Sequence, residues 1–94
     1  SLDDFLINTA DTGERRYIKT KIYIGYTESK LTEELDTKKP ILRDAVNGIL
    51  YSKKAAEMNQ AGLEVMKKEI MDKLNKLLTN GKIENVYYYD VILQ

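Results

Sequence analysis

The sequence contains no cysteine and no histidine. Without cysteine there is no disulfide framework and no thiolate metal site. The two missing residue types also include the most usual catalytic base and nucleophile. Paired carboxylates would be the remaining catalytic option, but Asp3-Asp4 and Glu33-Glu34 are sequence neighbours, whose side chains diverge in regular structure. The sequence therefore predicts a protein that is not an enzyme and that holds no cofactor.

A metal site and a nucleic-acid site are also not expected. Asp3, Asp4 and Asp11 are the only cluster that suggests a hard cation, and they lack the spacing of an EF-hand. Fifteen basic residues balance fifteen acidic ones, so the net charge is zero. A balanced chain has no general attraction to nucleic acid or to anionic lipid. No glycine-rich phosphate-binding motif occurs either.

Long apolar runs are missing as well. No stretch approaches the roughly 20 apolar residues that a membrane helix requires, and the start does not resemble a signal peptide. The chain begins at Ser1-Leu2 without an initiator methionine. We therefore expect that a membrane or targeting segment precedes it in the whole protein.

The residues that are present favour one small folded domain over residues 1–94. The chain is 43% apolar and 32% charged, as in ordinary globular domains. Residues 8–16 are polar and include Gly13, which predicts a turn or mobile loop, so residues 1–16 are expected to be partly flexible. The short apolar run at residues 5–7 is expected to form an edge strand.

Two longer stretches have the composition of strands. Residues 17–26 alternate strictly, which predicts one buried face and one face that meets water or a partner. Ten residues are many for one strand, so a bulge is expected near Gly25. Residues 83–94 are expected to pair with this strand, yet apolar residues occupy both faces. One face has Val86, Tyr88 and Ile92, and the other has Tyr87, Tyr89, Val91 and Leu93. We therefore expect the outer face to be covered by this chain or a neighbour.

Helices are expected between these strands. Residues 27–39 predict a weakly held helix with Thr27 or Ser29 as its cap. Pro40 suits the first turn of a helix over residues 41–51, in which Gly48 suggests close contact with another backbone. A short turn over residues 52–58 leads to a long amphipathic helix from about residue 62, which Asn80-Gly81 is expected to end. The predicted fold class is α+β, a small antiparallel sheet with helices packed on one face.

Three stretches, in order and in register, resemble the FliL family of flagellar basal-body proteins that associate with the stator units of the motor. Residues 40–54, PILRDAVNGILYSKK, resemble the pattern P-x-I-R-D-A-I-x-x-L-L-S-S-K-T. Residues 62–78, which follow Ala61, resemble the family's E-G-K-x-x-L-K-x-E-L-L-x-x-I-N-x-x-L segment from its glycine onward. Residues 81–94, GKIENVYYYDVILQ, match G-x-V-x-x-V-Y-F-T-x-F-V-x-Q. The chain departs from the family pattern at Ala61, Tyr88 and Tyr89.

The resemblance implies a fold similar to stomatin-type (SPFH) domains. It also implies a single-pass protein of the bacterial inner membrane, with its anchor helix ahead of Ser1 and this domain in the periplasm. Its partners would be the flagellar stator proteins and further copies of itself. The copies would form a ring around the stator units and support their engagement and torque generation.

Four residues are the candidate partner contacts, and they are Arg43, Asp44, Tyr87 and Tyr89. For the two charged residues the alternative is an ion pair within the chain or solvated helix charges. For the tyrosines the alternative is an ordinary amphipathic sheet. A different function also stays open, namely a small module that binds a protein or peptide on its tyrosine-rich face. We expect the isolated domain to be monomeric, because a polar interface is weak without the effective concentration that a membrane provides.

Overall fold

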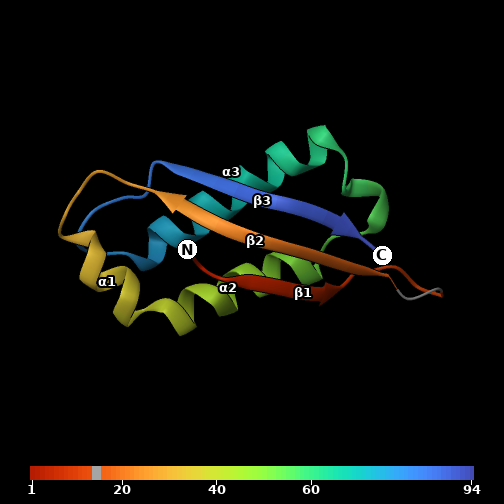
Figure 1. Cartoon of the computed structure of the whole chain (residues 1–94), viewed down its shortest axis with the longest axis horizontal. Coiled ribbons are helices and arrows are strands. Elements are labelled where there is room, and N and C mark those ends of the chain that lie inside the picture. Colours follow the sequence, from red (N-terminus) through yellow and green to blue (C-terminus); the bar gives the residue numbers. More distant parts are fainter. Residues whose placement is uncertain (14–15) are drawn as a thin grey trace.

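The computed structural model describes residues 1–13 and 16–94, and it has an α+β fold. Three antiparallel strands form one sheet in the order β1-β2-β3. The strands are β1 (Asp4–Asn8), β2 (Tyr17–Gly25) and β3 (Asn85–Leu93). The helices are α1 (Leu31–Thr37), α2 (Lys39–Tyr51), the short 3-10 helix η1 (Ala55–Glu57) and α3 (Gln60–Leu77). Figure 1 shows α2 and α3 behind the sheet, so the predicted fold class is confirmed.

The expected strands are confirmed, with β1 at one edge and β2 in the centre. On β2 the side chains of Ile18, Thr20 and Ile22 are buried, while the intervening residues point away from the helices. The turn expected at residues 8–16 begins later, because β1 runs to Asn8. Its residues 14 and 15 lie outside the described residues.

A bulge interrupts β3 instead of β2. Thr20 of β2 pairs with Val91 and the next residue, Lys21, pairs with Tyr89, so Asp90 is the extra residue. Its φ of 56° is left-handed, a conformation that aspartate tolerates better than most residues. The buried Thr20 hydroxyl donates a 2.7 Å hydrogen bond to the Asp90 carbonyl. The bulge predicted near Gly25 was therefore misplaced.

The bulge decides which side chains of β3 face the core. Before it, Val86 and Tyr88 point toward the helices, and after it Val91 and Leu93 do so, because the extra residue reverses the alternation. The assignment of Val91 and Leu93 to the face of Tyr87 was thus wrong. Both faces of β3 remain apolar, because Tyr87, Tyr89 and Ile92 point outward.

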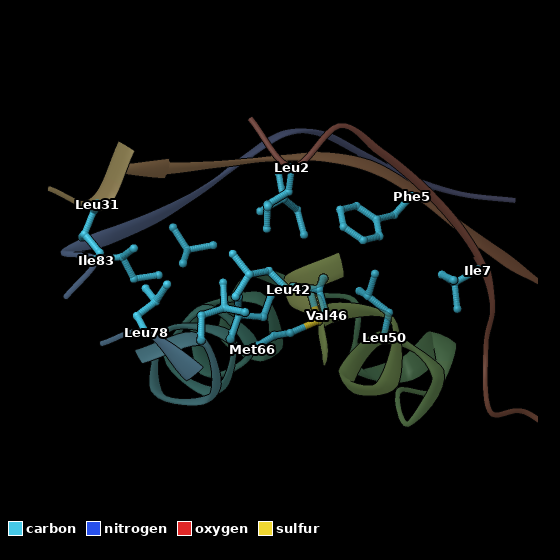
Figure 2. Close-up of a cluster of buried hydrophobic side chains, with 14 residues drawn as sticks. Leu2, Phe5, Ile7, Leu31, Leu42, Val46, Leu50, Met66, Leu78 and Ile83 are labelled. Atoms are coloured by element: carbon cyan, nitrogen blue, oxygen red, sulfur yellow. The ribbon is translucent and has the colours of Figure 1, made fainter. Parts of the chain in front are cut away.

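The core lies between the sheet and the helices (Figure 2). Strand β1 supplies two buried side chains, and α2 and α3 each supply three at spacings of four. The fully or nearly fully buried members include Leu2, Phe5, Ile7, Ile22, Leu42, Val46, Leu50, Met66, Ile70 and Leu74. In α2 Leu50 is buried, whereas Ala45 and Ile49 are only partly covered.

Two of the helices begin at other residues than predicted. Helix α1 starts at Leu31 without a side-chain cap, so neither Thr27 nor Ser29 has the predicted role. Helix α2 has its proline in the first turn as predicted. Helix α3 begins earlier than residue 62, because the Asn59 side chain caps it by accepting a 2.8 Å hydrogen bond from the Gly62 amide.

Helix α3 ends at Leu77, where Leu78 turns to an extended conformation, and not at Gly81. Gly81 has a φ of 154°, and a Cβ added there would lie 3.0 Å from Glu28 and 3.2 Å from Leu31. Its role is therefore to let the chain pass close to α1, which corrects the predicted helix stop. Among the described helices, none combines the length and the apolar character that spanning a membrane requires.

A buried carboxylate joins α1 to the segment between α3 and β3. Glu34 is 6% exposed, and its oxygens accept 2.8 Å hydrogen bonds from the Thr79 amide, the Thr79 hydroxyl and the Asn80 amide. The Lys38 ammonium lies 2.7 Å from the same carboxylate and also donates to the Leu77 carbonyl at 2.8 Å. These bonds close the end of α3 that lacks a glycine cap.

Candidate partner surface

The helices cover one face of the sheet, and the opposite face is exposed (Figure 1). Apolar and aromatic side chains from all three strands project from this face. Leu6 is 62% exposed, Tyr89 63% and Ile92 43%. We call the following set the outer sheet face: Leu6, Tyr17, Tyr23, Tyr87, Tyr89 and Ile92. An uncovered sheet face that carries this much apolar area is typical of an interaction surface.

Charged residues lie between the aromatic rings of the outer sheet face. Tyr23 and Tyr89 pack edge to face with centroids 6.5 Å apart. A hollow of about 230 Å³ lies beside Tyr89 and is bordered by Lys19, Lys21 and Asp90. Mixed aromatic and charged surfaces of this kind suit reversible contact with another protein.

The middle tyrosine of the 87–89 run has a different role. Tyr88 points into the core, and its hydroxyl donates a 3.0 Å hydrogen bond to the Leu63 carbonyl of α3. Burial, together with the nearby carboxylates of Glu64 and Glu69, raises the pKa of Tyr88. The side chain is therefore held in its neutral form and stabilises the packing of α3 on β3, leaving Tyr87 and Tyr89 as the exposed pair.

The Arg43 side chain forms contacts within its own chain. Its guanidinium donates to the Leu2 carbonyl and, at 2.9 Å, to the Asp4 carbonyl, and its Cζ lies 4.3 Å from the centroid of the Phe5 ring. The expected alternative to a partner contact was an ion pair or a solvated charge. The structure shows neither, because the acceptors are main-chain oxygens at the start of β1. A partner contact by Arg43 stays a prediction.

Replacing Arg43 by methionine is expected to lower the free energy of unfolding by about 1–2 kcal/mol, since two hydrogen bonds from a charged donor and a cation–π contact are lost. Urea denaturation followed by circular dichroism measures this. Arg43→Lys is the matched control, because it keeps the charge but not the two-pronged geometry. Its free energy of unfolding should lie between those of the unaltered protein and Arg43→Met. Equal stability of all three proteins would contradict a structural role for the guanidinium.

Asp44 lies on the helical side of the molecule and not on the outer sheet face. It is exposed at the rim of a groove of about 490 Å³ between α2 and α3. We call this feature the α2–α3 groove, and its lining residues are Ile41, Asp44, Ala45, Gly48, Ile49, Ser52, Lys73 and Leu77. The groove opens on the helical side of the molecule, away from the outer sheet face. The four predicted contacts therefore do not form one site, since Tyr87 and Tyr89 lie on one side and Asp44 on the other.

Gly48 faces open space in this groove. A Cβ built on it meets no atom of the described residues within 4 Å, so the predicted close contact with another backbone is not found among them. Glycine inside a helix destabilises it by roughly 1 kcal/mol relative to alanine. The domain therefore carries an unfavourable residue that its own packing does not require.

Gly48→Ala is expected to raise the free energy of unfolding by about 0.5–1 kcal/mol, because it restricts the unfolded chain and adds no clash. A shift of the urea midpoint to higher concentration measures it. Gly62→Ala is a contrasting control in α3, since its Cβ would collide with the Glu57 carbonyl. That variant should lose stability. A loss in both variants would show that Gly48 has a contact within the folded domain.

The aspartates considered for a cation are held apart by other partners. Asp3 lies 2.8 Å from the Lys39 ammonium, and that hydrogen bond lowers the pKa of Asp3. Asp4 is 3.8 Å from Lys21, and Asp11 accepts a 2.8 Å hydrogen bond from the Ala55 amide. Over residues 1–13 and 16–94, the structure brings together no group of three or more residues suited to metal binding.

Sequence reasoning missed several residues of both surfaces. Leu6, Tyr23 and Ile92 belong with the predicted tyrosines, and Ile41 lies 55% exposed in the groove. The alternation of residues 17–26 places Tyr23 on the outward face, so its exposure could be predicted from the sequence. The exposure of Ile92 could not, because its orientation depends on the bulge.

A family comparison and two individual relatives all match this chain to the same protein family. The family described as flagellar basal body-associated protein FliL matches the chain over residues 1–94. The flagellar protein FliL of Aquifex aeolicus (strain VF5) is 30% identical over 91 residues, which cover 96% of this chain and 56% of that protein. The flagellar protein FliL of Bacillus subtilis (strain 168) is 30% identical over 102 aligned positions, covering the whole chain and 73% of that protein. The chain thus spans a little over half the length of the first relative.

Proposed function

Because this chain belongs to the FliL family of flagellar basal body-associated proteins, we propose that it is a non-enzymatic accessory domain of the flagellar motor. The domain acts by association. Copies assemble into a ring around the stator units and support their engagement and torque generation. The domain lies in the periplasm and is held to the inner membrane by an anchor helix ahead of it.

The uncovered outer sheet face is the observation that supports this proposal most directly. It presents four tyrosines and two aliphatic side chains from three strands, at the side of the sheet opposite the helices. Its lysines and aspartates keep it soluble when the domain is free. A face of this composition binds weakly alone, and it gains strength when many copies are held in one membrane around one assembly.

Imaging of the tagged, membrane-anchored protein in flagellated cells tests the proposal. We expect foci at the base of the flagellum, co-purification of stator proteins, and loss of both in the double variant Tyr87→Ser/Tyr89→Ser. Tyr51→Ser is the matched control, since Tyr51 is an exposed tyrosine on α2 outside the outer sheet face. It should behave as the unaltered protein. Diffuse protein with no stator proteins bound would refute the role in the motor.

A peptide-binding module would use the same face. The hollow beside Tyr89 has about the volume of one large side chain and is bordered by both charge signs. A thermal-shift screen with extended peptides separates this function from assembly. A peptide that raises the unfolding temperature of the isolated domain, but not that of Tyr87→Ala, would favour the peptide-binding function. Assembly of the anchored protein in the absence of peptide would favour the role in the motor.

A further inference from the structure

Closed rings impose a condition on the surfaces that build them. In a ring of identical subunits each contact is heterologous, so every copy needs two different patches that fit each other. The outer sheet face and the α2–α3 groove are two such patches. They belong to opposite layers of the domain, the strands and the helices, so one copy can use both at once (Figures 1 and 2).

We propose that neighbouring copies meet head to tail, with the outer sheet face of one copy seated over the α2–α3 groove of the next. This inference rests on the self-association proposed above and specifies its contact. The occupant of each surface is therefore a second copy of this chain. Tyr87 and Tyr89 of one copy pack against Ile41, Ala45 and Gly48 of the other.

The shapes of the two surfaces are complementary. Tyr89 is among the most exposed side chains on the outer sheet face, and it projects beside Tyr87 from the same strand. Gly48, across the contact, leaves open space in a groove of about 490 Å³. A helix glycine without a packing role inside the domain is accounted for if an aromatic ring of a neighbour covers it. This explains an unfavourable residue that the isolated fold does not.

The charges on the two surfaces are also complementary. The groove carries Asp44 on one side and Lys73 on the other, and the outer sheet face carries Lys19 and Asp90 beside Tyr89. Within the described residues none of these four has an ion-pair partner, although five other pairs form. Each surface thus offers one acid and one base to the other. Head-to-tail docking pairs the acid of each surface with the base of the other.

Cysteine crosslinking in the full-length, membrane-anchored protein tests the contact, and these 94 residues contribute no cysteine other than the introduced ones. Tyr89→Cys and Gly48→Cys are placed in one chain, and membranes are treated with a short bis-maleimide. Both positions are open, so the variants keep the fold. We expect a ladder of dimers and higher oligomers. Mixing chains that carry one substitution each should give dimers alone. Ser29→Cys, exposed in the loop before α1, replaces Gly48→Cys as the control and should give no crosslink.

Charge exchange provides an independent measurement. Asp44→Lys should reduce the crosslinked fraction roughly two- to fivefold, the effect of one exposed ion pair, and Lys19→Glu in the same chain should restore it. Dimers formed by Tyr89→Cys alone would overturn the proposal, because they require two like faces in contact. A lack of crosslinks from this pair and from a second pair, Tyr87→Cys with Ile41→Cys, would also overturn it. Foci at the flagellar base in the same cells then show whether the motor role stands without this contact.

Discussion

The Glu34→Ala variant is expected to unfold at a temperature about 10 °C or more below that of the unaltered protein. Its carboxylate is the shared acceptor for three donors of Thr79 and Asn80, two of which are main-chain amides. Removing it leaves these donors without a partner in a part-buried site, which is costlier than losing the bonds alone. The Lys38 ammonium also loses its carboxylate at 2.7 Å. Thermal unfolding by circular dichroism measures the change, and Glu33→Ala, the exposed neighbour, should change little.

The same carboxylate makes the domain sensitive to acid. The hydrogen bond from the Lys38 ammonium and those from Asn80 and Thr79 lower the pKa of Glu34 from 4.5 to about 2. Because the folded-state pKa is depressed, this stabilisation is complete above pH 4.5 and is lost as the pH falls toward 2. Between these values the unfolding temperature of Glu34→Gln should fall less steeply than that of the unaltered protein. Parallel curves for the two proteins would show that the pKa of Glu34 is the same in the folded and unfolded states.

Phe5→Ala should lower the free energy of unfolding by about 3–5 kcal/mol, the usual cost of removing a buried phenylalanine. Phe5 is 2% exposed and packs between the core and the Arg43 guanidinium. Leu6→Ala is the matched control, because Leu6 is the next residue and points to the outer sheet face. It should change the stability by about 0.5 kcal/mol or less. Urea denaturation measures both.

The comparison of these two neighbours tests the register of β1. A shift by one residue would turn Leu6 inward and Phe5 outward, and the two effects would exchange. Comparable losses from both would instead mean that another chain covers Leu6 in the protein as tested. Sedimentation at the same concentration distinguishes that outcome, since such covering requires a larger particle.

The strands and the fold class could be predicted because their signals are local. Strict alternation over residues 17–26 identifies the buried face of β2, and Pro40 marks the start of α2. The bulge could not be predicted in this way. Asp90 is accommodated by a hydrogen bond from Thr20, seventy positions earlier in the chain, and no local pattern reports that contact. The inward direction of Val91 and Leu93 depends on the same contact.

The candidate site was predictable to a similar degree. The alternation of Tyr87, Tyr88 and Tyr89 indicated that neighbouring tyrosines face opposite ways, and the structure has the outer two exposed. The setting of Arg43 could not be foreseen, because its acceptors are carbonyls of Leu2 and Asp4, about forty positions away. Glu34 was likewise taken as one of two adjacent charges. Its burial depends on the segment that follows α3.

The attachment of the first residues has a mechanical consequence. The Leu2 amide donates to the Ile22 carbonyl at 2.8 Å, while the Leu2 carbonyl accepts from Arg43 of α2. Asp3 is held to Lys39 of the same helix at 2.8 Å. Tension applied ahead of Leu2 therefore loads the central strand and a helix together. The force is shared between both layers of the domain before β1 can be peeled from the sheet one bond at a time, which is the weaker mode of strand separation.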